Sequence, residues 1–151
     1  MTDSEAMGLA LSEARRALDH GDVPVGAVAL LDGDVVAADH NRREELRDPT
    51  AHAELLVLRT AARVVGGWRL GDVTLVVTLE PCPMCAGALV AARLGRLVFG
   101  TPDPRAGACG SIYNLCCDPR LNHDIPVTHG VRAAEASDLL AQFFATRRPA
   151  R

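Results

Sequence analysis

Two short motifs that must meet in space constrain the fold of this chain most strongly. The first is His52-Ala53-Glu54 and the second is Pro81-Cys82-Pro83-Met84-Cys85. One imidazole and two thiolates can hold a zinc ion and leave its fourth position open for water, as in catalytic zinc sites. Glu54 is two residues from the imidazole, so its carboxylate is expected to move protons to and from that water. The motifs therefore predict a catalytic zinc site with His52, Cys82 and Cys85 as ligands.

Both motifs fall at the start of a predicted helix. Exposed backbone N–H groups and the helix dipole favour anionic groups there, which helps Cys82 and Cys85 to remain thiolates. The i, i+3 spacing of the two cysteines brings both sulfurs to one side of the first helical turn. His52 comes from a different helix and completes three corners of a tetrahedron, with Glu54 near the metal but not bound to it.

The cysteines allow two other interpretations. Cys82 and Cys85 are also spaced like a thioredoxin-type redox pair. Together with Cys109 and either Cys116 or Cys117, they could instead form a structural zinc site of four cysteines. Neither alternative uses the imidazole or the carboxylate of the first motif, so the catalytic site is the favoured interpretation.

Composition narrows the class of protein. A chain of 151 residues with 48% hydrophobic residues fits one globular domain, 1–151, with a core of its own. No stretch approaches the roughly 18 consecutive apolar residues of a membrane span. The acidic, polar N-terminus is unlike a secretory signal. We therefore expect a cytoplasmic protein without a membrane partner.

Charge and cysteine content limit the partners and the compartment. The formal net charge is -3, and all 16 basic residues are Arg. Bulk charge therefore gives no sign of nucleic-acid binding, and contact with a polyanion must use a local patch. Five cysteines are an odd number, which does not suit a disulfide framework and indicates a reducing compartment.

Hydrophobic periodicity predicts helices that alternate with strands. Such an order is typical of a two-layer or three-layer α/β domain around one mixed sheet. A flexible loop is expected over 107–110, and the helix that carries the first motif is expected to begin at a cap formed by Asp48 or Thr50. The expected helices cover 4–18, about 51–63, 83–93 and 133–146, and the expected strands cover 23–31, 35–38, 73–79, 96–99 and 124–128.

The other conspicuous side chains have ordinary structural explanations. Trp68 and Phe99 are expected in the core, and by pattern alone Phe144 could lie there too. Four histidines are expected to be solvated or held by local hydrogen bonds: His20, His40, His123 and His129. Three cysteines are expected to be small buried or half-buried side chains: Cys109, Cys116 and Cys117.

At these residues the chain resembles the bacterial tRNA-specific adenosine deaminases, within the cytidine-deaminase-like superfamily. A His-x-Glu motif followed by Pro-Cys-x-x-Cys is the signature of the zinc nucleobase deaminases. Asn122-His123 and the aromatic, Arg-bearing last helix point more narrowly to the tRNA enzymes. Besides the two motifs, the resemblance includes Val23-Pro24-Val25-Gly26-Ala27, Asn41, Asp48-Pro49-Thr50-Ala51, Thr78-Leu79-Glu80, Ala86-Gly87-Ala88, Val98-Phe99-Gly100, Gly107-Ala108, Gly110-Ser111 and Phe143-Phe144 with Arg147-Arg148.

The resemblance implies a single zinc-dependent deaminase domain with a cytidine-deaminase-like fold. This fold is a three-layer α/β domain with a mixed five-stranded sheet flanked by helices, and the protein is implied to be a homodimer. The implied reaction is hydrolytic conversion of adenosine to inosine at the wobble position of a tRNA anticodon, usually in an arginine tRNA with anticodon ACG. The resemblance also implies that Glu54 is the proton shuttle. The residues implied to contact the flipped base or the anticodon loop are Asn41, the Ala53 backbone, Asp103, Asn122, His123 and Phe144.

Two other functions share part of this pattern. A deaminase of a free base or nucleoside, such as guanine or cytosine, would carry the same metal motif, but not the Asn122-His123 segment or the end of the last helix. A zinc-stabilised binding domain without catalysis would have no need of the unbound carboxylate of Glu54. Asn122-His123 and the end of the last helix therefore favour a tRNA enzyme over a free-base deaminase, and Glu54 favours an enzyme over a binding domain.

Overall fold

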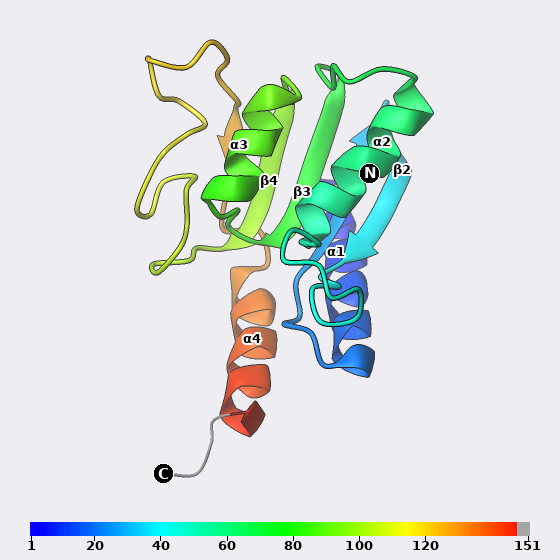
Figure 1. Ribbon diagram of the computed structural model, residues 1–151, viewed down its shortest axis with the longest axis vertical. Coiled ribbons are helices and arrows are strands. Elements are labelled where there is room, and N and C mark those ends of the chain that lie inside the picture. Colours follow the sequence, from blue (N-terminus) through cyan, green and yellow to red (C-terminus); the bar gives the residue numbers. More distant parts are fainter. Residues whose placement is uncertain (148–151) are drawn as a thin grey trace.

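Within residues 1–147, the part of the chain that this computed structural model describes, five strands form one mixed sheet (Figure 1). The strand order is β2-β1-β3-β4-β5. β1 is antiparallel to β2 and to β3, whereas β4 is parallel to both β3 and β5. The strands are β1 Gly26–Leu31, β2 Asp34–His40, β3 Val73–Leu79, β4 Arg96–Thr101 and β5 Val127–Thr128, and the helices are α1 Asp3–Ala17, η1 Leu18–His20, α2 Ala53–Val65, α3 Pro83–Ala91 and α4 Ala133–Arg147.

Alternation of side chains along the strands produces one core on each face of the sheet. On one face, Leu75 of β3 and Leu97 of β4 pack with residues of α2 and α3. On the other face, Val76 and Val98 of the same strands pack with residues of α1 and α4. Helices on both faces give three layers, so the expected three-layer α/β domain with a mixed five-stranded sheet is confirmed.

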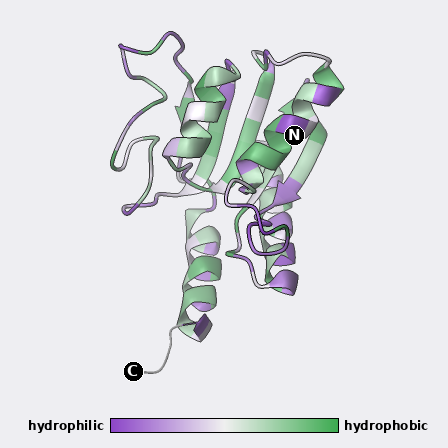
Figure 2. Cartoon of the chain, in the orientation of Figure 1, coloured by the Kyte–Doolittle hydropathy of each residue, from purple (hydrophilic) through white to green (hydrophobic). Residues whose placement is uncertain are grey.

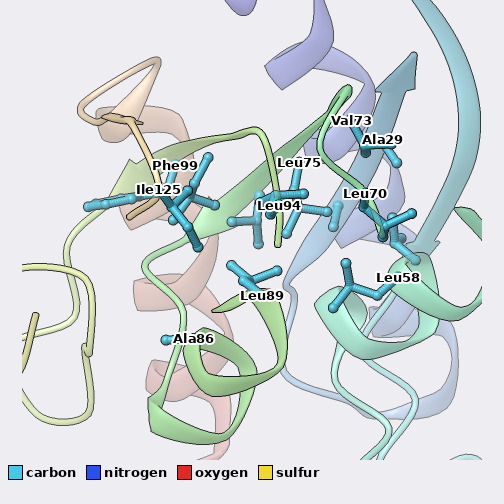
Figure 3. Packing of buried hydrophobic residues seen from close by; sticks show 14 of the residues in the cluster. Ala29, Leu58, Leu70, Val73, Leu75, Ala86, Leu89, Leu94, Phe99 and Ile125 are labelled. Carbon is cyan, nitrogen blue, oxygen red and sulfur yellow. The ribbon is translucent and has the colours of Figure 1, made fainter. Parts of the chain in front are cut away.

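The larger core lies between the sheet, α2 and α3. Figure 2 shows hydrophobic residues along the strands and polar residues concentrated in the loops and on the outer helix surfaces. In Figure 3 the side chains of Leu75, Leu89 and Leu94 converge between β3 and α3, with Ile125 beside Phe99. Phe99 is 4% exposed, as the prediction of a core position requires. Within the described residues, no helix is both long and apolar enough to cross a lipid bilayer.

Several element ends differ from the predicted ones. Asp32 and Gly33 form the turn between β1 and β2 with φ values of 53° and 81°, which suits a two-residue hairpin turn. β2 continues to His40, and β5 is only two residues long. The start of α2 was predicted at Asp48 or Thr50, but His52 occupies the N-cap. The Asp48 carboxylate accepts hydrogen bonds from Thr50 instead, so it closes a turn before the helix.

Two side chains that were expected to be buried are exposed. Trp68 is 57% exposed, because it follows the turn at Gly66 that ends α2 and lies in the connection to β3. The guanidinium carbons of Arg69 and Arg93 lie 4.8 and 5.9 Å from the centroid of its ring. Cys117 is exposed although its neighbour Cys116 is buried. The expectations of a core Trp68 and a buried or half-buried Cys117 were therefore wrong.

Hydrogen bonds hold the two histidines that join α1 to the sheet. His40 Nδ1 lies 2.7 Å from Glu13 Oε2 of α1, and His20 Nδ1 lies 2.6 Å from Asp22 Oδ2. The Nε2 atoms of the two rings are 3.1 Å apart. Asp22 also accepts the backbone N–H groups of Glu44 and Glu45. This chain of contacts fixes the loop that leads from β2 towards His52, and it satisfies both rings locally as expected.

Close contact between α1 and β1 depends on Gly26. A Cβ atom at Gly26 would overlap the backbone of Ala10 and Ala14 in α1. By contrast, a Cβ atom at Gly87 in α3 would meet no atom within 4 Å. The two glycines therefore form a matched pair: one is required by packing and the other is not.

We expect Gly26→Ala to lower the free energy of unfolding by about 1–3 kcal/mol, because the added methyl group forces α1 away from the sheet. Gly87→Ala should raise it by about 0.5–1 kcal/mol, because alanine favours the helix and finds open space. Urea unfolding of both variants beside the wild type checks the pair. Equal shifts for the two variants would contradict this account of Gly26.

Candidate functional site

The two sequence motifs meet on one face of the sheet. α2 and α3 contact each other there, and Figure 1 shows that both helices begin at the same end of the sheet. His52 is the N-cap residue of α2. β3 ends at Leu79, and Glu80-Pro81 then lead to Cys82, the N-cap residue of α3. Pro83 occupies the first turn of α3, where its missing N–H is not needed.

Three donor atoms converge at these helix starts. His52 Nδ1 lies 3.6 Å from Cys82 Sγ and 3.5 Å from Cys85 Sγ. All three donor atoms lie within 4.8 Å of one another. In a tetrahedral zinc site, Zn–S bonds of about 2.3 Å and Zn–N bonds of about 2.0–2.1 Å place nitrogen and sulfur roughly 3.5 Å apart. The spacing of the three donors therefore fits a zinc ion between them.

The protonation of the two thiols differs. A hydrogen bond from Cys85 is the largest cause that lowers the pKa of Cys82 to about 4, and His52 acts in the same direction. Cys82 is therefore a thiolate at neutral pH. Its hydrogen bond with Cys82, together with burial, raises the pKa of Cys85. A cation that binds at this site must displace the Cys85 proton, as is usual for thiolate ligands.

Glu54 lies beside this group without belonging to it. Its side chain is on the first turn of α2 and is 4% exposed. Burial is the largest cause that raises the pKa of the Glu54 carboxyl above its ordinary value. A raised pKa makes this carboxylate a better proton acceptor than an ordinary glutamate.

A small cavity of about 180 Å³ opens beside the three donor atoms. Of the three donor residues, Cys85 is buried behind the cavity, whereas His52 and Cys82 line it together with Glu54. A reacting group in the cavity therefore faces both the donor cluster and the carboxyl group. The other lining residues are Val23, Val25, Asn41, Arg43, Ala53, Leu79, Glu80, Asp103 and Ala106.

A larger groove of about 800 Å³ adjoins the small cavity. The two share Val23, Leu79 and Asp103 in their walls, so the cavity opens towards the groove. α4 forms the far wall, where Phe144 is 48% exposed. The groove is further lined by Thr101, Pro102, Pro104, Arg105, Ser137, Leu140, Ala141, Ala145 and Arg147.

The structure brings together most of the residues proposed for substrate contact. Asn41, Ala53 and Asp103 line the small cavity, and Phe144 lines the groove. Two others do not join them: Asn122 and His123 line neither space. His123 Nε2 lies 2.8 Å from the carbonyl oxygen of Leu94, in the connection that follows α3. Arg147 lines the groove, and Arg148 lies outside the described residues.

Asn41 is held in place on both sides of its amide. Its Nδ2 donates to the carbonyl oxygen of Val23 at 3.2 Å, and its Oδ1 accepts the backbone N–H of Arg43 at 3.1 Å. Both contacts fix the cavity wall that faces Glu54. Arg43 itself lines the cavity and was not predicted, because an arginine in a polar loop ordinarily carries no distinguishing signal.

Glu80 is the most informative cavity residue that the sequence interpretation did not assign. Its side chain is 2% exposed and accepts hydrogen bonds from Asp103 N, Cys109 N, Ser111 N and Ser111 Oγ. Burial acts to raise the pKa of Glu80, but these hydrogen bonds lower it below its ordinary value. The segment 107–110, expected to be a flexible loop, is therefore tied to the end of β3. The sequence signal that could have identified Glu80 is the position of an acidic residue directly between a buried strand and the motif that begins at Pro81.

The alternative site of four cysteines is wrong. Cys109 and Cys116 lie 3.5 Å apart, Sγ to Sγ, and are buried together. Within residues 1–147, neither joins the donor group of His52, Cys82 and Cys85. A second group of potential ligands consists of Glu13, Asp39 and His40. There, the His40 Nδ1 atom is already engaged by Glu13.

Comparison with known proteins agrees with this geometry. The sequence pattern of the MafB19-like deaminase family matches residues 1–148. The tRNA-specific adenosine deaminase of Bacillus subtilis (strain 168) is 46% identical over 145 residues, which cover 95% of this chain and 90% of that protein. The tRNA-specific adenosine deaminase of Agrobacterium fabrum is 46% identical over 142 residues, covering 94% and 93% of the two chains.

Solved structures show the same fold. A structure from work on A-to-I editing by tRNA:A34 deaminases superposes with a TM-score of 0.87 at 44% identity, covering 91% of this chain and 99% of that one. A guanine deaminase from Nitrosomonas europaea superposes with a TM-score of 0.81 at 25% identity, covering 95% and 85%. With 46% identity over at least nine-tenths of both sequences, the chain belongs to the deaminase family of the bacterial tRNA-specific adenosine deaminases.

Proposed function

We propose that this protein is a zinc-dependent deaminase that hydrolyses adenosine to inosine at the wobble position of a tRNA anticodon, with an arginine tRNA of anticodon ACG as its main substrate. The observation that carries the proposal is the position of the His52, Cys82 and Cys85 donors. They lie beside a small cavity that is lined by His52, Glu54 and Cys82 and opens into a groove. Relatives at 46% identity are tRNA-specific adenosine deaminases.

His52, Cys82 and Cys85 are proposed to hold one zinc ion. The fit rests on their spacing and on the donor set, one imidazole and two sulfurs, which is typical of catalytic rather than structural zinc sites. Bound zinc supplies acidity to a water molecule and so makes a nucleophile available at neutral pH.

Glu54 is proposed to move the protons of the reaction. Its carboxylate accepts a proton from the attacking water, whose oxygen forms a bond to C6 of the adenine ring. Glu54 returns this proton to the ring nitrogen N1. It then takes the proton of the new hydroxyl group on C6 and passes it to the amino group. The C6–N bond breaks, ammonia leaves and inosine remains. The raised pKa of Glu54 supports this role, because the group must both accept and donate protons near neutral pH.

The small cavity is proposed to receive the target base, with Asn41 and the Ala53 backbone beside it. A base must leave its stack to enter such a cavity, which costs little in the single-stranded anticodon loop. The groove is proposed to take the flanking nucleotides. Phe144 offers an aromatic surface for base stacking, and Arg105 and Arg147 offer charge near phosphates.

Three wider features complete the proposal. We propose one catalytic domain over 1–151, a cytoplasmic location and a homodimer. The homodimer is supported by large apolar side chains that are exposed at the start of α3 and in the connection after β4, because homodimer interfaces bury such side chains. These side chains are Met84, Ile112, Tyr113 and Leu121.

Incubation of the purified protein with total tRNA, followed by sequencing, should reveal A-to-G changes at the wobble position of an arginine tRNA. Glu54→Gln should lower the rate at least about 100-fold with zinc content unchanged, because it removes the proton shuttle but no ligand. Ammonia release from free guanine or cytosine is measured in parallel. Efficient release from a free base with no inosine in tRNA would refute tRNA editing, and a near wild-type rate for Glu54→Gln would refute the shuttle.

Phe144→Ala should raise KM for a tRNA anticodon stem–loop roughly 10-fold to 100-fold, the effect of losing one stacked base. The melting temperature should change little, because the ring is about half exposed. Phe143→Ala is the matched control: that ring is 8% exposed, and its loss should lower the free energy of unfolding by about 3–5 kcal/mol. An unchanged KM for Phe144→Ala would show that this ring does not contact RNA.

A further inference from the structure

The two carboxylate oxygens of Glu80 accept hydrogen bonds from four donors. Oε1 accepts from Asp103 N at 3.0 Å and from Ser111 Oγ, and Oε2 accepts from Cys109 N and Ser111 N, both at 3.0 Å. All four donors belong to the segment 103–111, which follows β4. A buried carboxylate whose partners are all donors from one segment acts as an anchor for that segment.

The anchored segment is the wall between the cavity and the groove. Asp103 lines both spaces, Ala106 lines the cavity, and Pro104 and Arg105 line the groove. The Asp103 carboxylate accepts the N–H groups of Arg105 and Ala106, and its carbonyl oxygen accepts that of Gly107. The position of Asp103, which Glu80 holds, therefore sets the position of the whole turn.

Gly107 shows how closely the wall approaches the anchor. A Cβ atom at this position would overlap the carboxylate of Glu80. Gly107 has no left-handed φ, so glycine is needed here for space and not for backbone conformation. A side chain here would push the wall and the carboxylate apart.

We infer that Glu80 is a positioning residue: it holds the wall 103–111 in the place that receives the nucleotides next to the target base. This inference rests on the proposed function, since it assigns the segment to recognition of the anticodon loop. Glu80 contacts the wall and is not one of the convergent metal donors. Its loss should therefore weaken the binding of a long substrate more than it slows the chemical step.

Glu80→Gln tests this directly, because an amide cannot satisfy four donors. If its NH₂ group faces Cys109 N and Ser111 N, two N–H groups lose their acceptor. If it faces the other side, the Ser111 hydroxyl can turn to accept, but Asp103 N is left without a partner. With a synthetic anticodon stem–loop RNA, Glu80→Gln should raise KM roughly 10-fold. The kcat should stay within about threefold of wild type, and zinc content should be unchanged.

Two further variants serve as a partial loss of the contact and as a control. Ser111→Ala removes only the hydroxyl donor and keeps the three backbone contacts, so KM should rise less than for Glu80→Gln. Glu135→Gln makes the same chemical change at an exposed carboxylate that pairs with Arg132 at the start of α4 and lines neither space. It should leave KM unchanged. If Glu80→Gln fails to fold, the Ser111→Ala result decides, and an unchanged KM there overturns the inference.

A second readout separates this inference from the proposed function. Amide hydrogen exchange should be faster in Glu80→Gln than in wild type at residues 103, 109 and 111, whatever the substrate of the protein. No inosine from the wild-type protein would refute the proposed function but would leave this measurement intact. Unchanged exchange with unchanged KM would overturn the inference. Loss of zinc or a fall in kcat without a rise in KM would overturn it too, since Glu80 would then support the metal site.

Discussion

The convergence of two helix N-termini on one face of the sheet is the constraint on which the rest of this structure depends. His52 and Cys82 occupy the N-cap positions of α2 and α3, and Cys85 is on the first turn of α3. Hydrogen bonds from Cys85 and His52 lower the pKa of Cys82 to about 4, which favours the thiolate that the site requires. Because α2 and α3 pack on the same core with β3, a rigid scaffold fixes the three donors.

Two buried glutamates beside this centre show how environment assigns a role to one residue type. Glu54 lies in the small cavity, and burial raises the pKa of its carboxyl group. Glu80 is also inaccessible to solvent, but hydrogen bonds from the segment 103–111 lower the pKa of its carboxyl group. The first environment suits a group that exchanges protons, and the second suits a permanently charged anchor. We propose that proton transfer and substrate positioning are thereby divided between these two carboxylates.

The sequence predicted correctly those elements that are determined by residues close together along the chain. The apolar run of β3 and the start of α3 near Cys82 follow from residues near one another in sequence. The meeting of His52 with the two cysteines was predicted from the ligands that a catalytic zinc ion requires. Glu80 could not be assigned this way, because its partners are more than twenty residues away along the chain. The start of α2 was misplaced because Asp48 caps a preceding turn instead. Trp68 looked like a core residue, yet its position in the connection after α2 leaves it exposed.

We propose that three protein ligands hold a zinc ion with one position open. X-ray absorption at the zinc edge of the loaded protein tests it most directly, since sulfur and lighter ligands differ in distance. We expect two sulfur ligands at about 2.3 Å and two nitrogen or oxygen ligands at about 2.0–2.1 Å. Four sulfur ligands, or a full set of protein ligands with no exchangeable water, would contradict it.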